Sequence, residues 1–336
     1  MLSGILVSND SGGTALDASI VACLQDIGRW KGRVMKSNSL VFAAFVSVFL
    51  CSGATALAQM PGGMGNGTFM GYGGHNMDHD LILPQMVVGQ HYSTSLLLLN
   101  MGDPRVMTWV SPQELTTTGK VYLYHQDGSR LQVSVNGGPP VSEFAFSLDP
   151  SRSAHYELSS AGSDTPGWAL IDVDEPASGS GWGMMDGQTM TRGMRIMADV
   201  FYTYSDSGQP SSRVGVMPSM YEMGKFATSI ISAQSNDDLY TGVALVNTNA
   251  KAVTVTLRLR DSDGNTLATS PLTLGPGNQV AKFINQIFPS NMPADFRGFL
   301  EVSSSDEGVV AMGLLFGQGL LTSLPMMHYG QIGMMP

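Results

Sequence analysis

The amino-acid sequence predicts an all-β protein made of two consecutive β-sandwich domains. The first observation is the stretch Leu239–Leu274, where apolar residues alternate with polar ones as in a strand with one buried face. The second is Asp263-Gly264, which separates two such runs and predicts a hairpin, because glycine adopts the positive φ that the turn requires. The third is that this arrangement of strand-like blocks occurs twice in the chain.

An internal duplication relates a first domain at residues 81–218 to a second at residues 225–327. Thr94–Asn100 matches Thr241–Asn247 position for position, and further blocks follow in the same order. A period of roughly 140 residues is too long for a solenoid and suits tandem domains. The other matched blocks are Val121–Gly128 with Thr256–Gly264, Phe144–Tyr156 with Leu272–Phe283, Gly167–Val173 with Gly298–Val302, and Val200–Pro218 with Gly313–Pro325.

The amino-terminal region carries the pattern of a secretory signal. Residues 35–58 begin with Met35-Lys36, continue with the apolar run Leu40–Leu50 and end with Ala56-Leu57-Ala58. We interpret residues 1–34 as an extension that precedes the true initiator methionine, Met35, and that results from a start codon assigned too far upstream. The alternatives are a lipoprotein anchored through Cys51 and an uncleaved membrane anchor. The signal reading predicts an exported protein, periplasmic, cell-surface or extracellular, with no transmembrane segment in the mature chain.

Charge and cysteine content limit the partners of the exported protein. The chain has a formal net charge of −10 and no basic stripe, so nucleic acid is not an expected partner. Cys23 and Cys51 both precede the predicted cleavage site, so the mature chain cannot form a disulfide. The expected partner is a protein or polysaccharide of the cell envelope or its surroundings.

Residues 59–80 are rich in glycine and methionine and predict a disordered, flexible linker. Soft thioether and imidazole ligands suit Cu(I), so this segment is a candidate metal site. The alternative is a low-complexity spacer, and no cofactor is predicted. The candidate metal ligands are Met60, Met64, Met70, His75, Met77 and His79.

The two domains are expected to differ in their connections. The first carries insertions at residues 101–119 and 175–195, both marked by glycine, proline or methionine. The second carries one short helix at Gln279–Phe288, where apolar residues recur at helical spacing and Pro289 ends the run.

The order of motifs in the second domain resembles the tandem immunoglobulin-like modules of uncharacterised secreted bacterial proteins. The residues that carry the resemblance are Asn247, Asp261–Gly264, Pro276-Gly277, Phe296-Arg297-Gly298 and Leu324-Pro325. The first domain departs from the pattern at the helix and through its insertions. The resemblance implies immunoglobulin-like sandwiches and an exported location, and it implies no activity.

The chain lacks the sequence signatures of common catalytic sites. It contains no nucleophile elbow, no phosphate-binding loop and no zinc-protease motif. His91, His125 and His155 are expected in or beside strands, as solvent-facing or hydrogen-bonded side chains. Asp172 and Asp174 are expected to be surface carboxylates, since nothing in the sequence indicates a cleft around them.

Asp261-Ser262-Asp263-Gly264 resembles the start of a calcium loop but lacks the distal glutamate, and we interpret it as a hairpin.

The sequence therefore predicts a noncatalytic exported binding or structural module that acts through loops and sheet faces. The alternative is a periplasmic copper-handling protein that uses the Met/His-rich segments. An enzyme on a sandwich scaffold is the third reading.

Overall fold

The computed structural model describes residues 80–101, 116–174, 196–206, 209–216, 222–223, 228–236, 239–290, 292–317, 320–324 and 326–329. The predicted extension at 1–34, the signal peptide at 35–58 and all but the last residue of the linker at 59–80 lie outside these residues. The described residues all belong to one compact unit. We call residues 80–216 the first half and residues 222–329 the second half.

The described chain is almost entirely β-structure, which confirms the predicted all-β class. Its one described helix is α3 (Ile284–Ile287). The alternation of apolar and polar residues in the sequence corresponds to an alternation of buried and more exposed side chains. In β14 (Val253–Asp261), Val255, Leu257 and Leu259 are buried, and the residues between them are more exposed. Side chains with a period of two place one set in the core and the other on the outer face.

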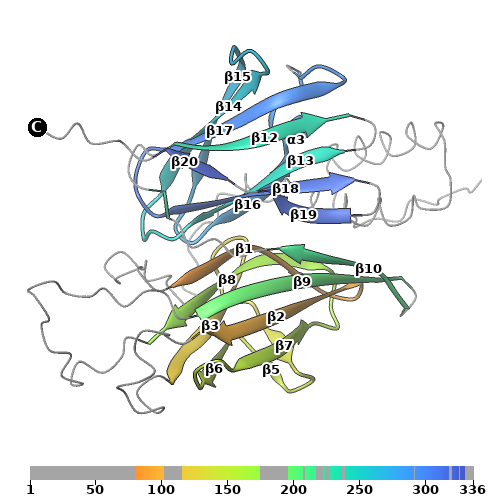
Figure 1. Ribbon diagram of the computed structural model, residues 1–336, viewed down its shortest axis with the longest axis vertical. Coiled ribbons are helices and arrows are strands. Elements are labelled where there is room, and N and C mark those ends of the chain that lie inside the picture. Colours follow the sequence, from red (N-terminus) through yellow and green to blue (C-terminus); the bar gives the residue numbers. More distant parts are fainter. Residues whose placement is uncertain are drawn as a thin grey trace, which may run out of the picture. The chain divides into compact units, whose positions relative to one another are not determined.

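The first half contains two antiparallel sheets (Figure 1). The four-stranded sheet has the order β1-β8-β3-β6, and the six-stranded sheet has the order β10-β9-β2-β7-β4-β5. These strands are β1 (Leu81–Val88), β2 (Tyr92–Asn100), β3 (Thr117–His125), β4 (Val133–Val135), β5 (Pro140–Val141), β6 (Glu143–Leu148), β7 (Ser153–Ser159), β8 (Thr165–Val173), β9 (Ile196–Asp206) and β10 (Gln209–Val216).

The strands of the second half form one hydrogen-bonded path in which β12 and β13 are joined only by the pair Ser235 and Tyr240. Two groups of strands result: β18 and β13 with β11, β16 and β19, and β12, β17, β14 and β15 with β20. The strands not yet bounded are β11 (Glu222–Met223), β12 (Thr228–Ser235), β13 (Tyr240–Asn247), β15 (Thr266–Leu274), β16 (Gln279–Phe283), β17 (Phe296–Ser304), β18 (Val309–Gly317), β19 (Leu320–Leu324) and β20 (Met327–Tyr329).

The same strand pairings occur in both halves. The pairings β1·β8, β3·β8, β3·β6, β2·β7, β2·β9 and β9·β10 correspond in order to β12·β17, β14·β17, β14·β15, β13·β16, β13·β18 and β18·β19. The blocks that match in sequence are the strands in corresponding places. Two blocks are shifted relative to the sequence match. Val121 takes the place of Leu257, and the block Phe144–Tyr156 corresponds to Ser270–Lys282 instead of Leu272–Phe283.

Two buried asparagines explain why the matched blocks end in the same residue. The side-chain amide of Asn100 donates to the carbonyl of Leu148 at 2.9 Å, and that of Asn247 donates to the carbonyl of Leu274 at 3.1 Å. Asn100 therefore connects the ends of two strands in different sheets, and Asn247 connects the ends of two strands in the two strand groups of the second half. A buried amide needs such partners, because an unsatisfied polar group is costly.

The predicted helix at Gln279–Phe288 is wrong over its first half. Residues 279–283 form strand β16, which pairs antiparallel with β13, and only residues 284–287 are helical. Gln279, Ala281 and Phe283 are buried in alternation, so this stretch also fits a strand period. The edge of β13 offers hydrogen-bond partners, and this long-range pairing overrides the local helical spacing.

The hairpin reading of Asp261–Gly264 is confirmed. The Gly264 amide donates to the Asp261 carbonyl at 3.1 Å, and Gly264 has φ 85°. The Asp261 carboxylate accepts hydrogen bonds from the backbone amides of Asp263 and Asn265, so it serves the turn. Gly128 has φ 82° in the corresponding turn of the first half.

A buried glutamine connects the two halves. The Gln279 backbone amide donates to the Gln126 carbonyl at 2.8 Å, and its side-chain oxygen accepts from the Gln126 amide at 2.8 Å. Its side-chain nitrogen donates to the Pro84 carbonyl at 3.0 Å and to the Gln85 side chain. Gln279 is only 2% exposed, so these bonds lie away from solvent.

Aromatic packing extends the contact between the halves. The Trp168 indole is fully buried and donates to the Gly277 carbonyl at 2.9 Å, and it stacks on Tyr124 at 4.2 Å between ring centroids. The Arg130 guanidinium lies 4.7 Å from the Tyr124 ring centroid. Buried clusters contain residues of both halves, so the halves share part of their core.

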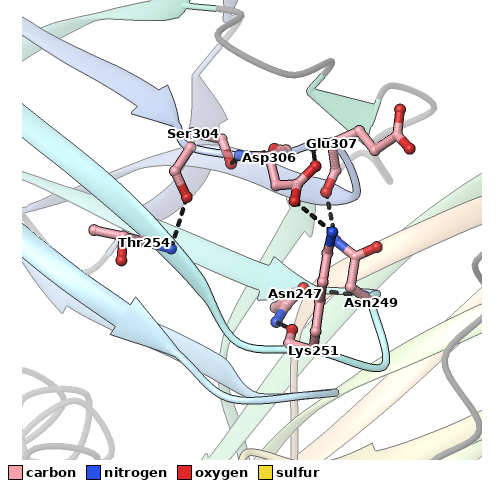
Figure 2. A network of polar contacts seen from close by, with 8 residues as sticks. Asn247, Asn249, Lys251, Thr254, Ser304, Asp306 and Glu307 are labelled. Atoms are coloured by element: carbon pink, nitrogen blue, oxygen red, sulfur yellow. Dashed lines mark hydrogen bonds and ion pairs between the residues drawn. The ribbon is translucent and has the colours of Figure 1, made fainter.

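A polar network closes the loop between β13 and β14 in the second half (Figure 2). Lys251 pairs with Asp306 at 2.5 Å, and the Asn249 amide donates to the Glu307 carbonyl. The Asn249 backbone amide donates in turn to the Asn247 side chain at 3.0 Å. This network joins the β13–β14 and β17–β18 connections. Lys251 is exposed, and we therefore regard its pair with Asp306 as a minor contribution to stability.

Candidate binding face of the second half

The residues predicted as metal ligands cannot be placed. Met60, Met64, Met70, His75, Met77 and His79 all lie outside the described residues. Within the described ranges, no group of three His, Cys, Asp or Glu side chains is arranged to hold a metal ion. The copper hypothesis therefore stays a prediction.

Two of the histidines considered in the sequence form hydrogen-bonded pairs. His91 contacts Asp164 at 2.8 Å, and His155 contacts Glu157 at 3.1 Å and the Ser95 hydroxyl at 3.2 Å. A serine nucleophile needs a histidine whose two ring nitrogens separately contact the serine and the acid. Here the single nitrogen Nε2 contacts both, and Ser95 donates directly to Glu157 at 2.5 Å. The cluster is therefore not arranged as a catalytic triad.

The most distinctive polar surface lies on the outer face of β14 and β17. Period-two alternation places Arg258 and Arg260 on one side of β14 and the core residues on the other. In the antiparallel register Arg258 lies opposite Glu301, and Arg260 lies opposite Phe299. We call this surface the arginine face and define it by Arg258, Arg260, Arg297, Phe299, Glu301 and Ser303.

A carboxylate clamped by two guanidinium groups lies at the centre of the arginine face. Arg258 Nη1 lies 2.6 Å from Glu301 Oε1, and Arg260 Nε lies 2.6 Å from Glu301 Oε2. Arg260 also donates from Nη1 to the Gly264 carbonyl at 3.0 Å, in the turn that follows β14. Both arginines are thus held in place by residues of their own sheet, whereas free arginine side chains are mobile.

The protonation of Glu301 follows from these contacts. Burial by itself raises the pKa of the carboxyl, but hydrogen bonds from Arg260 and then Arg258 outweigh it, and the pKa lies below its ordinary value. Glu301 is therefore ionised at neutral pH. It neutralises one of the two arginines that it contacts.

The arginine face retains unused hydrogen-bond donors. A guanidinium carries five N–H donors, and the contacts within the described residues leave Nη2 of both Arg258 and Arg260 available to a partner. Both side chains are about one-third exposed. Phe299 is 38% exposed and presents an aromatic surface beside Arg260. The face thus combines fixed cationic donors with an aromatic ring.

Sequence reasoning missed this face. The alternation of Arg258 and Arg260 already indicated that both lie on one side of a strand. Glu301 lies far along the chain, and only the register of β14 against β17 brings it between the two arginines.

Comparison with known proteins places the chain in no family. No protein-family model matches it, and no curated protein matches it in sequence. A salicylate 1,2-dioxygenase from Pseudoaminobacter salicylatoxidans, in complex with gentisate, shares 8% identity at a TM-score of 0.20, over 96% of this chain and 99% of its own. A Momordica charantia 7S globulin shares 8% identity at a TM-score of 0.20, over 75% of this chain and 73% of its own. A vicilin from Capsicum annuum shares 7% identity at a TM-score of 0.16, over 69% of this chain and 75% of its own. At TM-scores this low, none of these likenesses informs the fold or function of this chain.

The fold and the face define an all-β protein with an organised polar surface. No helix in the described part of the chain is long and apolar enough to cross a membrane.

Proposed function

We propose that this protein is a noncatalytic exported binding module, and that its arginine face recognises a carboxylate-bearing polysaccharide of the cell envelope or surroundings. The observation that carries the proposal is the pair Arg258 and Arg260, held by Glu301 with donors left over. Donors that are already ordered lose less conformational entropy on binding. Guanidinium groups also match carboxylates in shape and charge.

The charge of the face supports an anionic partner. The whole chain has a net charge of −10, whereas the arginine face combines three arginines with Glu301, and Asp295 at its margin lies 4.0 Å from Arg297. An acidic ligand is repelled by most of the protein and attracted to this surface, so it is directed there. The exposed Phe299 ring adds apolar contact area, which suits the apolar C–H face of a sugar ring.

The attachment of the two insertions supports a second contact region in the first half. Asn100 at the end of β2 pairs with Ile196 at the start of β9, and Gly119 of β3 pairs with Val173 at the end of β8. The insertions predicted at 101–119 and 175–195 therefore leave and re-enter the sheets at neighbouring strand ends. β3 begins at Thr117, so the last three residues of the first insertion belong to the strand.

Affinity electrophoresis through gels that contain polygalacturonate tests the proposal. The wild-type chain should be retarded, and Arg260→Gln and Phe299→Ala should each lose most of the retardation. Retardation should also decrease with added salt, because the Debye length falls to about 8 Å at physiological ionic strength. Neutral dextran should retard none of the proteins.

Arg152→Gln is the matched control, because it removes an exposed arginine of the first half. It should migrate like the wild type. If Arg152→Gln and Arg260→Gln lose retardation equally, the interaction depends on total charge and the arginine face is not the site. Binding to an acidic protein but to no acidic polysaccharide would assign the face to a protein partner instead.

The domain and export assignments belong to the same proposal. We propose two tandem sandwiches of immunoglobulin-like character, because the central pairings β2·β7 and β3·β8 are repeated as β13·β16 and β14·β17. Export predicts a mature amino terminus at Gln59. Amino-terminal sequencing of protein from the culture medium or periplasm tests this, and detection of residues 1–34 would contradict it.

A further inference from the structure

A cleft opens between the edge strands β15 and β16 of the second half. β15 pairs only with β14, and β16 pairs only with β13, so neither carries a strand partner on its other side within the described chain. The cavity between them has a volume of about 90 Å³. The residues of its lining that matter for binding are Val243, Leu245, Leu257, Ser270, Lys282 and Gln286.

The internal duplication shows why the cleft is open. In the first half, Tyr156 on β7 pairs with Leu96, and Phe144 on β6 pairs with Val121. The rings of Phe144 and Tyr156 pack against each other with 4.8 Å between their centroids. By strand correspondence, the places of Phe144 and Tyr156 are taken in the second half by Ser270 and Lys282. In the first half an aromatic pair fills the space between β6 and β7, and β7 also carries β4 on its outer side; in the second half Ser270 and Lys282 leave this space open, and β16 pairs with no such strand within the described residues.

The cleft has an apolar floor and a rim of hydrogen-bond donors. Val243, Leu245 and Leu257 are at most 1% exposed. At the rim, the Gln286 side-chain oxygen accepts from the Phe283 amide at 2.9 Å, which leaves its NH₂ group to donate. The Lys282 ammonium and Ser270 hydroxyl supply further donors, and no acidic side chain of the described residues lines the cleft.

The geometry points to a binding site for a short aliphatic carboxylate of about four to six carbons. The acyl chain packs against the apolar floor, and the carboxylate meets Lys282, Ser270 and Gln286 at the rim. The volume limits the chain, because an apolar cavity of about 150 Å³ accommodates benzene and this cleft is smaller. A positive charge with two neutral donors selects an acid over an alcohol or an amine.

This site is separate from the arginine face. Leu257 and Arg258 are neighbours on β14 but point to opposite sides of the sheet, the first into the cleft and the second outward. The two proposals can therefore fail independently.

Equilibrium dialysis of the full chain with radiolabelled pentanoate at neutral pH tests the site. Uptake should saturate at one equivalent per chain, and pentan-1-ol should compete about tenfold more weakly, since it lacks the charge-assisted hydrogen bond. Lys282→Met should weaken pentanoate binding about tenfold while leaving pentanol binding unchanged. The double variant Ser270→Phe/Lys282→Tyr, which installs the aromatic pair of the first half, should abolish the binding of both.

Thr273→Phe is the control, because it adds a ring to the exposed side of the same strand. It should bind pentanoate as the wild type does, and circular dichroism should show that every variant is folded. The inference is overturned if the wild type shows no saturable uptake, or if the folded double variant still binds. It is also overturned if Lys282→Met self-associates but binds pentanoate normally, because an inward-pointing lysine can instead protect an edge strand from pairing.

Discussion

Replacement of Gln279 by alanine should destabilise both halves of the protein together. The Gln279 side chain is almost fully buried and makes three hydrogen bonds to the first half, with the Pro84 carbonyl, the Gln85 side chain and the Gln126 side chain. The alanine variant leaves these three polar groups without their partner. The loss of each costs about 1–3 kcal/mol, and water that enters the vacated space favours the lower end.

The expected total is therefore about 3 kcal/mol, a large share of a typical stability of ~5–15 kcal/mol. For a chain of this size the corresponding fall in Tm is roughly 6 °C or more. Scanning calorimetry measures the fall, and circular dichroism in urea measures the free energy of unfolding. Gln279→Glu keeps the side-chain shape but replaces the amide donor by a carboxylate oxygen, so it should be destabilised at least as much.

Gln234→Ala provides the control, since Gln234 lies on the outer side of β12 and its partly exposed side chain makes no hydrogen bond within the described residues. It should change Tm by less than about 1 °C. A Gln279→Ala variant that unfolds at the wild-type temperature would refute the reasoning. Two separate transitions, of which only one moves, would show that the glutamine does not couple the halves.

Three further predictions concern the core, the arginine face and the amino-terminal segment. Leu259→Asp should unfold the second half, because Leu259 is fully buried and does not line the cleft, and an unpaired buried carboxylate costs several kcal/mol; retention of the wild-type circular dichroism spectrum would contradict this. Because the pKa of Glu301 is lowered below 4.5 in the folded state, its ionised form stabilises the protein above that pH. Glu301→Gln should therefore be less stable at pH 7, by about 1 kcal/mol, and the difference should shrink as urea denaturation is repeated below pH 4.5. Deletion of residues 59–80 should remove weak Cu(I) binding in a competition titration against a chelator; equal binding by both proteins would mark the segment as a spacer.

Part of the fold could be predicted because its signals are local. The Asp263-Gly264 turn needs a positive φ, and Gly264 adopts one, so the hairpin was readable from two residues. The inward register of Leu257 was equally readable, because alternation along β14 is a property of the strand itself. The helix at Gln279–Phe288 was wrong where the local pattern fitted both structures, and pairing with β13 decided between them.

The candidate sites were harder to predict from the sequence, because they depend on which strands are neighbours. The duplication was visible in sequence, yet its most informative consequence was not. That consequence is the substitution of Ser270 and Lys282 for an aromatic pair, which requires the registers of β6, β7, β15 and β16.

The sequence by itself determined the all-β class, the repeated order of five strand-like blocks and the Asp-Gly hairpin turn, since side-chain periodicity and glycine conformation act within a few residues. Tertiary structure alone decided three features. It set Glu301 between two arginines, it buried Gln279 among groups of the first half, and it left a cleft between β15 and β16. Each joins residues far apart in the chain, and the free energy of such contacts depends on strand register and packing, which no local pattern encodes.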